Sequence, residues 1–201
     1  MRLFSILLLA AAAPLAAAVL PEGTTLMSRD GRITLRYPAA VQPALDFGGR
    51  ALLSGGWRVM WDGKPAGPGV GLVSFTQRAR PSDGRGQASE MVRFGGSRDR
   101  HVIASCLSAG FDPALAHKLP DRTINGRSWT AWRGSDAGMN QGVEIVSLRT
   151  RANGACYALD RISYVVRAAE APPAGTPNQK TAAATMDAIV ATLRIAATPS
   201  P

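Results

Sequence analysis

Apolar and polar residues alternate along several short stretches of the chain, as they do in half-buried β-strands. The alternation is clear in Ile33–Tyr37, and Pro38 ends it. Asp30-Gly31, Asn125-Gly126 and Asn153-Gly154 are turn sequences that join neighbouring strands into hairpins. The strands predicted in this way are 24–28, 32–37, 57–61, 70–80, 88–94, 122–124, 127–133, 143–150 and 156–166.

The strand predicted at 156–166 differs from the others because both of its faces carry apolar residues. One face has Cys156, Ala158, Ile162, Tyr164 and Val166, and the other has Tyr157, Leu159 and Val165. Such a strand needs cover on both sides, so we expect it at the centre of a sheet.

Two segments follow helical spacing. Ser97 caps the first, which we expect to run to about Ala109. Thr176-Pro177 opens the second, whose apolar stripe consists of Met186, Ile189, Val190 and Leu193. One more helical turn is expected at 112–118, and a loop at 134–142. An antiparallel sheet with a mid-chain helix and a C-terminal helix packed on it is an α+β domain.

The first eighteen residues have the pattern of a secretory signal peptide. Arg2 gives a positive start, residues 3–15 are mostly apolar, and Ala16-Ala17-Ala18 supplies the small residues that a signal peptidase reads. The alternative is a membrane anchor, but the run is shorter than the roughly 20 residues of a span. Glu22 also starts a polar stretch directly afterwards.

Cleavage after Ala18 sets the expected organisation of the chain. It leaves a single α+β domain over 19–195 and a disordered tail over 196–201. No later apolar segment is long enough to cross a bilayer. We therefore expect a periplasmic or secreted protein.

The chain is strongly basic, with a formal net charge of +9. Removing residues 1–18, whose only charged side chain is Arg2, leaves +9 − 1 = +8. The cations are scattered without a run of Lys or Arg, and export separates the protein from most nucleic acid, so nucleic-acid binding is not expected. Attraction to an anionic polymer or phosphorylated lipid of the envelope stays open.

Cys106 and Cys156 are the only cysteines, and an even number in an exported chain predicts a disulfide. Free thiols or metal binding together with His101 and His117 are the alternatives. However, His101 and Cys106 are five residues apart and would not share a helix face. No Cys-x-x-Cys pair occurs. We expect a disulfide, no metal and no cofactor.

Four short segments resemble a group of uncharacterised exported proteobacterial proteins, a likeness that covers roughly residues 70–195 and implies no known activity. They are Gly95–Asp99, Pro120–Gly126, Ser135–Met139 and Gly154–Ala158. The early strand ending at Tyr37-Pro38, a late strand with a tyrosine and the C-terminal helix also resemble the PsbP-like α/β/α sandwich. That resemblance implies an antiparallel sheet between helices and a non-enzymatic accessory role.

Catalytic motifs are absent from the sequence. There is no Gly-x-Ser-x-Gly elbow and no Ser-x-x-Lys pair. An envelope hydrolase would have to use His101 or a carboxylate pair among Asp136, Glu144 and Asp160. Asp136 lies in a turn sequence, where an aspartate ordinarily bonds its own backbone. Asp160, next to Arg161, is expected to be an ion-pairing or buried polar residue.

Tryptophan and arginine lie together at two places, a composition typical of binding surfaces: Trp57 and Trp61 flank Arg58, and Trp129 and Trp132 lie between Arg127 and Arg133. Trp129 and Trp132 are an odd number of positions apart, so one should enter the core while the other is partly exposed. The predicted binding residues are Arg127, Trp129, Trp132, Arg133, Asp136, Met139, Asn140 and Gln141.

The resulting hypothesis is a non-enzymatic exported envelope protein that binds a protein, a glycan or an anionic polymer. Two other functions stay open: an envelope hydrolase, and an inhibitor of a secreted hydrolase that uses the 134–142 loop.

Overall fold

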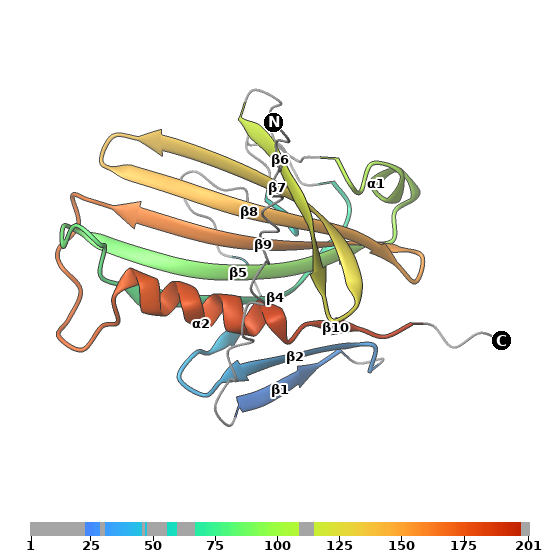
Figure 1. Ribbon diagram of the computed structural model, residues 1–201, viewed down its shortest axis with the longest axis horizontal. Coiled ribbons are helices and arrows are strands. Elements are labelled where there is room, and N and C mark those ends of the chain that lie inside the picture. Colours follow the sequence, from blue (N-terminus) through green and yellow to red (C-terminus); the bar gives the residue numbers. More distant parts are fainter. Residues whose placement is uncertain are drawn as a thin grey trace, which may run out of the picture.

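The computed structural model describes residues 23–28, 31–45, 47, 56–59, 67–108 and 115–197. A seven-stranded antiparallel sheet dominates the molecule, with strand order β3-β4-β5-β9-β8-β7-β6 (Figure 1). Its strands are β3 (Pro43–Ala44), β4 (Val70–Ala79), β5 (Gln87–Ser97), β6 (Ala116–Ile124), β7 (Arg127–Gly138), β8 (Gln141–Ala152) and β9 (Ala155–Val166).

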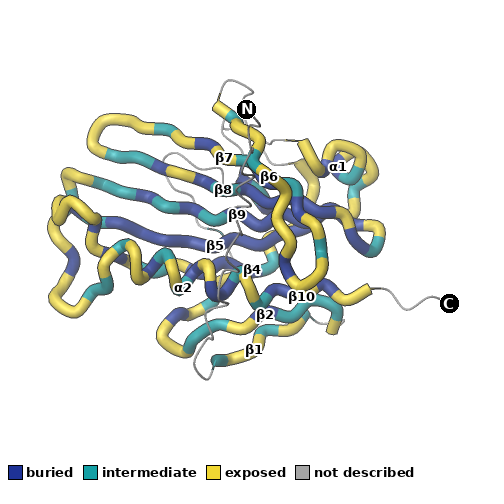
Figure 2. Tube along the Cα trace, viewed as in Figure 1, coloured by how far each residue is buried: buried dark blue, intermediate teal, exposed yellow. Residues whose placement is uncertain are grey.

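The strand with two apolar faces is central, as its sequence predicts. Strand β9 is fourth in the order and pairs with β5 on one side and β8 on the other. Figure 2 shows nearly continuous burial along β5 and much of β9. The α+β fold class is confirmed.

A smaller antiparallel sheet lies beside the large one and contains β1 (Gly23–Met27), β2 (Ile33–Pro38) and β10 (Arg194–Ile195). The predicted first hairpin is therefore confirmed. Strand β10 follows the C-terminal helix and pairs with β2, which brings the two ends of the domain together (Figure 1).

Helix α2 (Gln179–Ala191) packs across the large sheet and buries Met186 and Ile189 against it. It begins later than predicted. Asn178 is the N-cap in place of Thr176, and its Oδ1 accepts a hydrogen bond from the Thr181 backbone N–H at 2.8 Å. Asn and Thr are both favourable N-cap residues, so residue type alone could not show at which of the two the helix begins.

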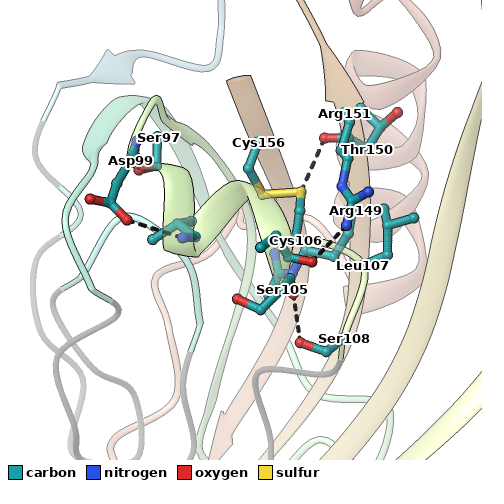
Figure 3. Close-up of a disulfide and its surroundings, with 12 residues drawn as sticks. Ser97, Asp99, Ser105, Cys106, Leu107, Ser108, Arg149, Thr150, Arg151 and Cys156 are labelled. Atoms are coloured by element: carbon teal, nitrogen blue, oxygen red, sulfur yellow. Dashed lines mark hydrogen bonds between the residues drawn. A yellow bond between two sulfur atoms is a disulfide. The ribbon is translucent and has the colours of Figure 1, made fainter. Parts of the chain in front are cut away.

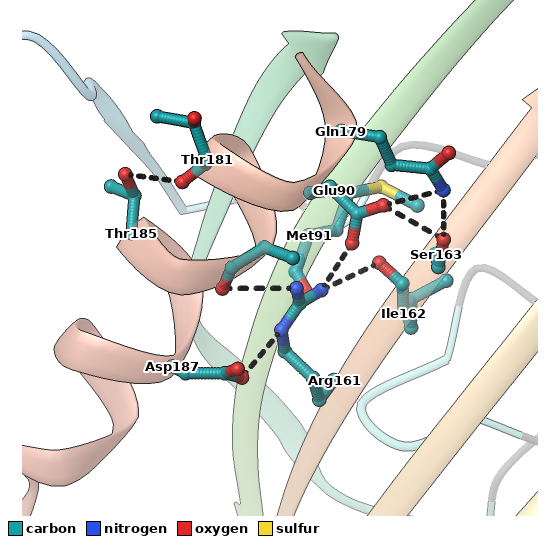
Figure 4. Close-up of polar contacts among 10 residues, drawn as sticks. Glu90, Met91, Arg161, Ile162, Ser163, Gln179, Thr181, Thr185 and Asp187 are labelled. Atoms are coloured by element: carbon teal, nitrogen blue, oxygen red, sulfur yellow. Dashed lines mark hydrogen bonds and ion pairs between the residues drawn. The ribbon is translucent and has the colours of Figure 1, made fainter. Parts of the chain in front are cut away.

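Arg161 of β9 joins α2 to the sheet through both of its guanidinium edges (Figure 4). Nη1 lies 2.8 Å from the buried Glu90 carboxylate, and Nε lies 3.0 Å from Asp187 on the helix. Gln179 Nε2 donates to Glu90 at 3.0 Å and to Ser163 Oγ at 2.9 Å. A buried carboxylate is thereby satisfied by both the sheet and the helix.

Helix α1 (Arg100–Ala104) covers part of the opposite face of the sheet and is shorter than predicted. Asp99, not Ser97, caps it. Ser105 Oγ and Ser108 Oγ donate to the carbonyls of His101 and Ser105, and such hydroxyl bonds compete with further helix.

The predicted disulfide between Cys106 and Cys156 is present and fastens the end of α1 to β9 (Figure 3). Both cysteines are fully buried in a small cluster with Trp57, Val102 and Ala158. The bridge therefore holds the short helix against the sheet.

The prediction of a loop at 134–142 is wrong. Strand β7 continues to Gly138 and β8 begins at Gln141, so only Met139 and Asn140 form the turn. Asn140 has φ +60°, a conformation that asparagine tolerates better than most residues. The long loop on which the inhibitor hypothesis depended is therefore absent from 134–142, and only a narrow hairpin turn is present there.

Two other local predictions are corrected. Residues 116–118 belong to β6 rather than to a helical turn, because their backbone pairs with β7. Residues 57–59 form no strand; the Val59 N–H is instead bonded to the Asp160 carboxylate at 2.7 Å. The predicted signal peptide lies outside the described residues, as do 198–201 of the predicted tail.

Candidate functional site

The predicted binding residues separate into two groups because β7 is long. Arg127 and Trp129 lie at the start of the strand, beside the small sheet. The others lie along its second half and at the turn to β8: Trp132, Arg133, Asp136, Met139, Asn140 and Gln141.

The two tryptophans occupy opposite faces of β7, as their spacing predicts. Trp129 is only 1% exposed and packs in the main core with Leu148 and Leu159. Trp132 is half-buried on the other face, where its Nε1–H donates to the Leu107 carbonyl at 3.0 Å. Both indoles therefore support the fold, and a Trp129→Ala variant would remove core rather than surface.

The polar residues in the second half of β7 are bonded to one another or to neighbouring strands. Arg133 Nη2 lies 2.8 Å from Glu144, and Asp136 Oδ1 accepts the Ala137 N–H at 2.7 Å. The Gln141 side chain accepts from the Tyr164 hydroxyl. Met139 is 95% exposed at the turn. This region offers an exposed apolar tip with its polar groups already paired nearby.

Arg127 and Trp129 instead line a cavity of about 860 Å³ between the large and small sheets, which we call the arginine cavity. The β6–β7 turn, the β7 and β8 ends and the β2 and β10 strands form its walls. Four of its lining residues are arginines: Arg32, Arg127, Arg151 and Arg194. No carboxylate side chain belongs to its described lining residues.

The chain segment after α2 is fixed at this cavity by side chains from two hairpin turns. Asn125 Nδ2 donates to the carbonyls of Ala191 and Leu193 at 2.8 and 2.9 Å. Asn153 Nδ2 donates to the Ala196 carbonyl at 2.8 Å. These bonds place Arg194 on the rim of the cavity, in the short strand β10.

The charged groups of the arginine cavity are hydrogen-bond donors, whereas the side chains of Thr34, Asn125, Ser128 and Thr150 can also accept. Arg127 Nη2 donates to the Ile195 carbonyl at 3.1 Å and keeps further N–H groups. Arg151 Nη2 is turned towards the Ala104 carbonyl of α1, at 2.7 Å. The buried Nε1–H of Trp129 has no hydrogen-bond partner among the described residues. A site of guanidinium and N–H donors can bind phosphate, sulfate or carboxylate oxygens.

The carboxylates considered for hydrolysis do not form a pair. Asp160 lies directly opposite Ser147, whereas Glu144 is three residues from Ser147 on β8 and so projects from the other face of the sheet. His101 is exposed on α1, where its ring nitrogen accepts from Arg100 Nε at 3.3 Å. Asp136 lies opposite Val143, four residues along β8 from Ser147, so among the described residues it is not a direct neighbour of Asp160 either.

Asp160 is fully buried, as expected, but its ion-pair partner is Arg149 rather than Arg161. Arg149 Nη1 lies 2.9 Å from Asp160 Oδ1, and Ser147 Oγ donates to the same oxygen. Arg149 Nε and Nη2 have no hydrogen-bond partner within the described part of the chain.

The charge of Asp160 also affects the pKa values of two more arginines, Arg93 and Arg58. Burial lowers the pKa of Arg93, while Asp160 raises it and Arg149 lowers it. Burial also lowers the pKa of Arg58, followed by the repulsion of Arg149, and Asp160 acts against both. Arginine stays charged at these shifts, so Asp160 is a counter-ion for several buried cations.

Among the described residues, no three His, Cys, Asp or Glu side chains come together as a metal site would require. The two helices of that part of the chain are both too short, or too polar, to cross a membrane.

Arg32, Arg151 and Arg194 were not predicted from the sequence as site residues. Each is a single arginine without a motif, and Arg32 and Arg194 are far from Arg127 in the chain. The pairing of β2 with β10 brings Arg32 and Arg194 to the cavity, and Arg151 reaches it from the end of β8. Arg127, Trp129 and the Asn125-Gly126 turn are the predicted features that lie at this cavity.

Comparison with protein-family models and with curated proteins finds no match. Among solved structures, the chain is similar to a protein of Bacteroides thetaiotaomicron VPI-5482, at 9% identity and a TM-score of 0.39. That alignment covers 86% of this chain and 48% of the other, so the chain spans about half of its length. It is also similar to LpqN, which is involved in cell envelope biogenesis of Mycobacterium tuberculosis, at 12% identity, a TM-score of 0.39, and 86% and 91% coverage.

Proposed function

We propose that this protein is a non-enzymatic exported protein of the cell envelope that binds an anionic polymer at the arginine cavity. The observation that carries the proposal is the charge of that cavity, which has four arginines and no carboxylate among its described lining residues.

Export is supported by two features of the chain. The predicted signal peptide at 1–18 directs the protein out of the cytoplasm. The Cys106–Cys156 disulfide is of a kind that persists in oxidising compartments. The resemblance to exported proteobacterial proteins and to the PsbP-like sandwich fits this location and belongs to the proposal.

Binding of dextran sulfate, measured by isothermal titration calorimetry with neutral dextran as the reference, tests the proposed function. The double variant Arg127→Gln/Arg194→Gln removes two cations from the cavity, and we expect at least about tenfold weaker binding. Raising the salt concentration should weaken wild-type binding as well.

The matched control is Arg133→Gln/Arg167→Gln, which removes two exposed cations outside the cavity. We expect the control to keep nearly wild-type affinity. An equal loss in both double variants would mean that binding follows only net charge and would overturn the cavity as the site. Absence of saturable binding to dextran sulfate would overturn the proposal altogether.

A further inference from the structure

A second cavity, of about 690 Å³, lies between the β1–β2 hairpin and the ends of β4, β5 and β9. A smaller one of about 190 Å³ shares Ser28, Ile33 and Leu72 with it, so the two adjoin. None of the described residues that line them lines the arginine cavity. We call the pair the apolar cavity.

The walls of the larger part are mainly apolar, formed by Ile33, Pro68, Val70, Leu72, Ala155 and Tyr157. Two of its polar lining side chains, Asp99 and Ser97, are already used within the chain. Asp99 Oδ1 accepts the N–H groups of His101 and Val102 at the start of α1, at 2.9 and 3.1 Å. Ser97 Oγ donates to the Pro68 carbonyl. The cavity therefore presents a surface suited to hydrocarbon.

Exposed apolar side chains gather at the same place. Met27, Leu45 and Val70 are 63%, 74% and 62% exposed, and each lines one part of the apolar cavity. A single exposed apolar residue is ordinary, but several around one apolar cavity mark a binding site. The total volume is within the range of about 300–1,000 Å³ that small-molecule sites occupy.

Arg98 provides a cation at the edge of this cavity. It is exposed, and its Nη1 makes one long hydrogen bond of 3.4 Å to the Asn153 carbonyl. Most of its guanidinium donors remain for a ligand. Asp99, the next residue, also lines the cavity and keeps its negative charge, but its Oδ1 is held by the first N–H groups of α1.

We propose that the apolar cavity binds a long-chain fatty acid, with the hydrocarbon chain between the β1–β2 hairpin and β5 and the carboxylate at Arg98. A fatty acid has one flexible apolar chain, which matches the apolar walls, and one terminal carboxylate, which matches Arg98 at the rim. A second copy of this chain would need a broad surface of roughly 800 Å² per partner, whereas these apolar residues line concave cavities.

Calorimetric titration of the full exported chain with palmitate tests this site, with hexanoate as the short-chain reference. We expect saturable 1:1 binding of palmitate and much weaker binding of hexanoate, because fewer CH₂ groups leave water. Val70→Asp places a charge at the mouth and should weaken palmitate binding at least about tenfold. Met139→Asp, at the distant β7–β8 turn, is the matched control and should bind as the wild type does.

Arg98→Gln tests the carboxylate contact and should weaken palmitate binding about tenfold. Equal palmitate affinity in the wild type, Val70→Asp and Arg98→Gln would overturn the proposal, as would the absence of saturable binding. Dimerisation that Val70→Asp abolishes would instead assign the surface to a second copy. Since Val70→Asp should leave dextran sulfate binding intact, failure here is distinguishable from failure at the arginine cavity.

Discussion

Asp160 shows how one residue determines the state of several others. Its carboxylate accepts hydrogen bonds from the Val59 N–H and the Ser147 hydroxyl, and it forms an ion pair with Arg149. Burial lowers the pKa of Arg93, and the charge of Asp160 acts against that shift. Removing one partner of a buried pair leaves the other charge without compensation, and that loss exceeds the net value of the pair itself. Asp160 therefore contributes to the stability of the fold.

We expect Asp160→Asn to lower the free energy of unfolding by about 3–5 kcal/mol, because Arg149 stays buried without a counter-ion. Urea unfolding followed by circular dichroism measures the change. Asp187→Asn is the matched control, since Asp187 is 70% exposed in its ion pair with Arg161, and we expect a change within about 0.5 kcal/mol. Similar losses in both variants would contradict the role of burial.

At the scale of elements, the hairpin turns also determine where the C-terminal segment lies. Asn125 and Gly126 have φ +46° and +78°, as a type I′ turn requires. The Asn125 side chain then satisfies the Ala191 carbonyl, one of the last four carbonyls of α2, which lack partners within the helix. One turn residue thus shapes a hairpin, caps a helix and sets one wall of the arginine cavity.

Replacing Asn125 with glycine separates these roles, because glycine keeps the positive φ and loses the side chain. We expect a loss of about 1–3 kcal/mol for two hydrogen bonds and faster hydrogen exchange at residues 193–196. Asn140→Gly is the control at the β7–β8 turn, where the Asn140 backbone carbonyl, rather than its side chain, bonds the Arg167 N–H. Unchanged exchange at 193–196 in Asn125→Gly would refute the capping role.

At the scale of the whole molecule, the disulfide connects elements that local structure would leave loosely joined. Helix α1 has only five residues and cannot be stable by itself. The bridge closes a loop with a sequence separation of 50, which is worth on the order of 4 kcal/mol by restricting the unfolded chain.

The double variant Cys106→Ser/Cys156→Ser should therefore lower Tm by roughly 8–16 °C, measured by calorimetry. Reduced wild-type protein, with both thiols confirmed by mass spectrometry, should show the same shift. An unchanged Tm in either preparation would mean that the bridge does not contribute to stability.

The parts of this fold that follow from neighbouring residues were readable from the sequence. Alternation identified most strands, Asn-Gly pairs located two hairpin turns, and a lone pair of cysteines predicted the disulfide. The apolar faces of 156–166 also placed that strand at the centre. Each of these signals depends on the period of one strand or on one turn.

The positions of the two candidate binding cavities, and the residues at which strands and helices end, depend on the tertiary structure and could not be predicted from the sequence. The 134–142 segment reads as a loop, yet pairing with a neighbour extends both strands through it. Arg32, Arg127 and Arg194 become one cavity only when β10 pairs with β2, and Arg149 meets Asp160 only across the β8–β9 ladder. The periodicity of a sequence indicates which face of a strand is buried. A cavity depends instead on which distant segments of the chain pack against that face.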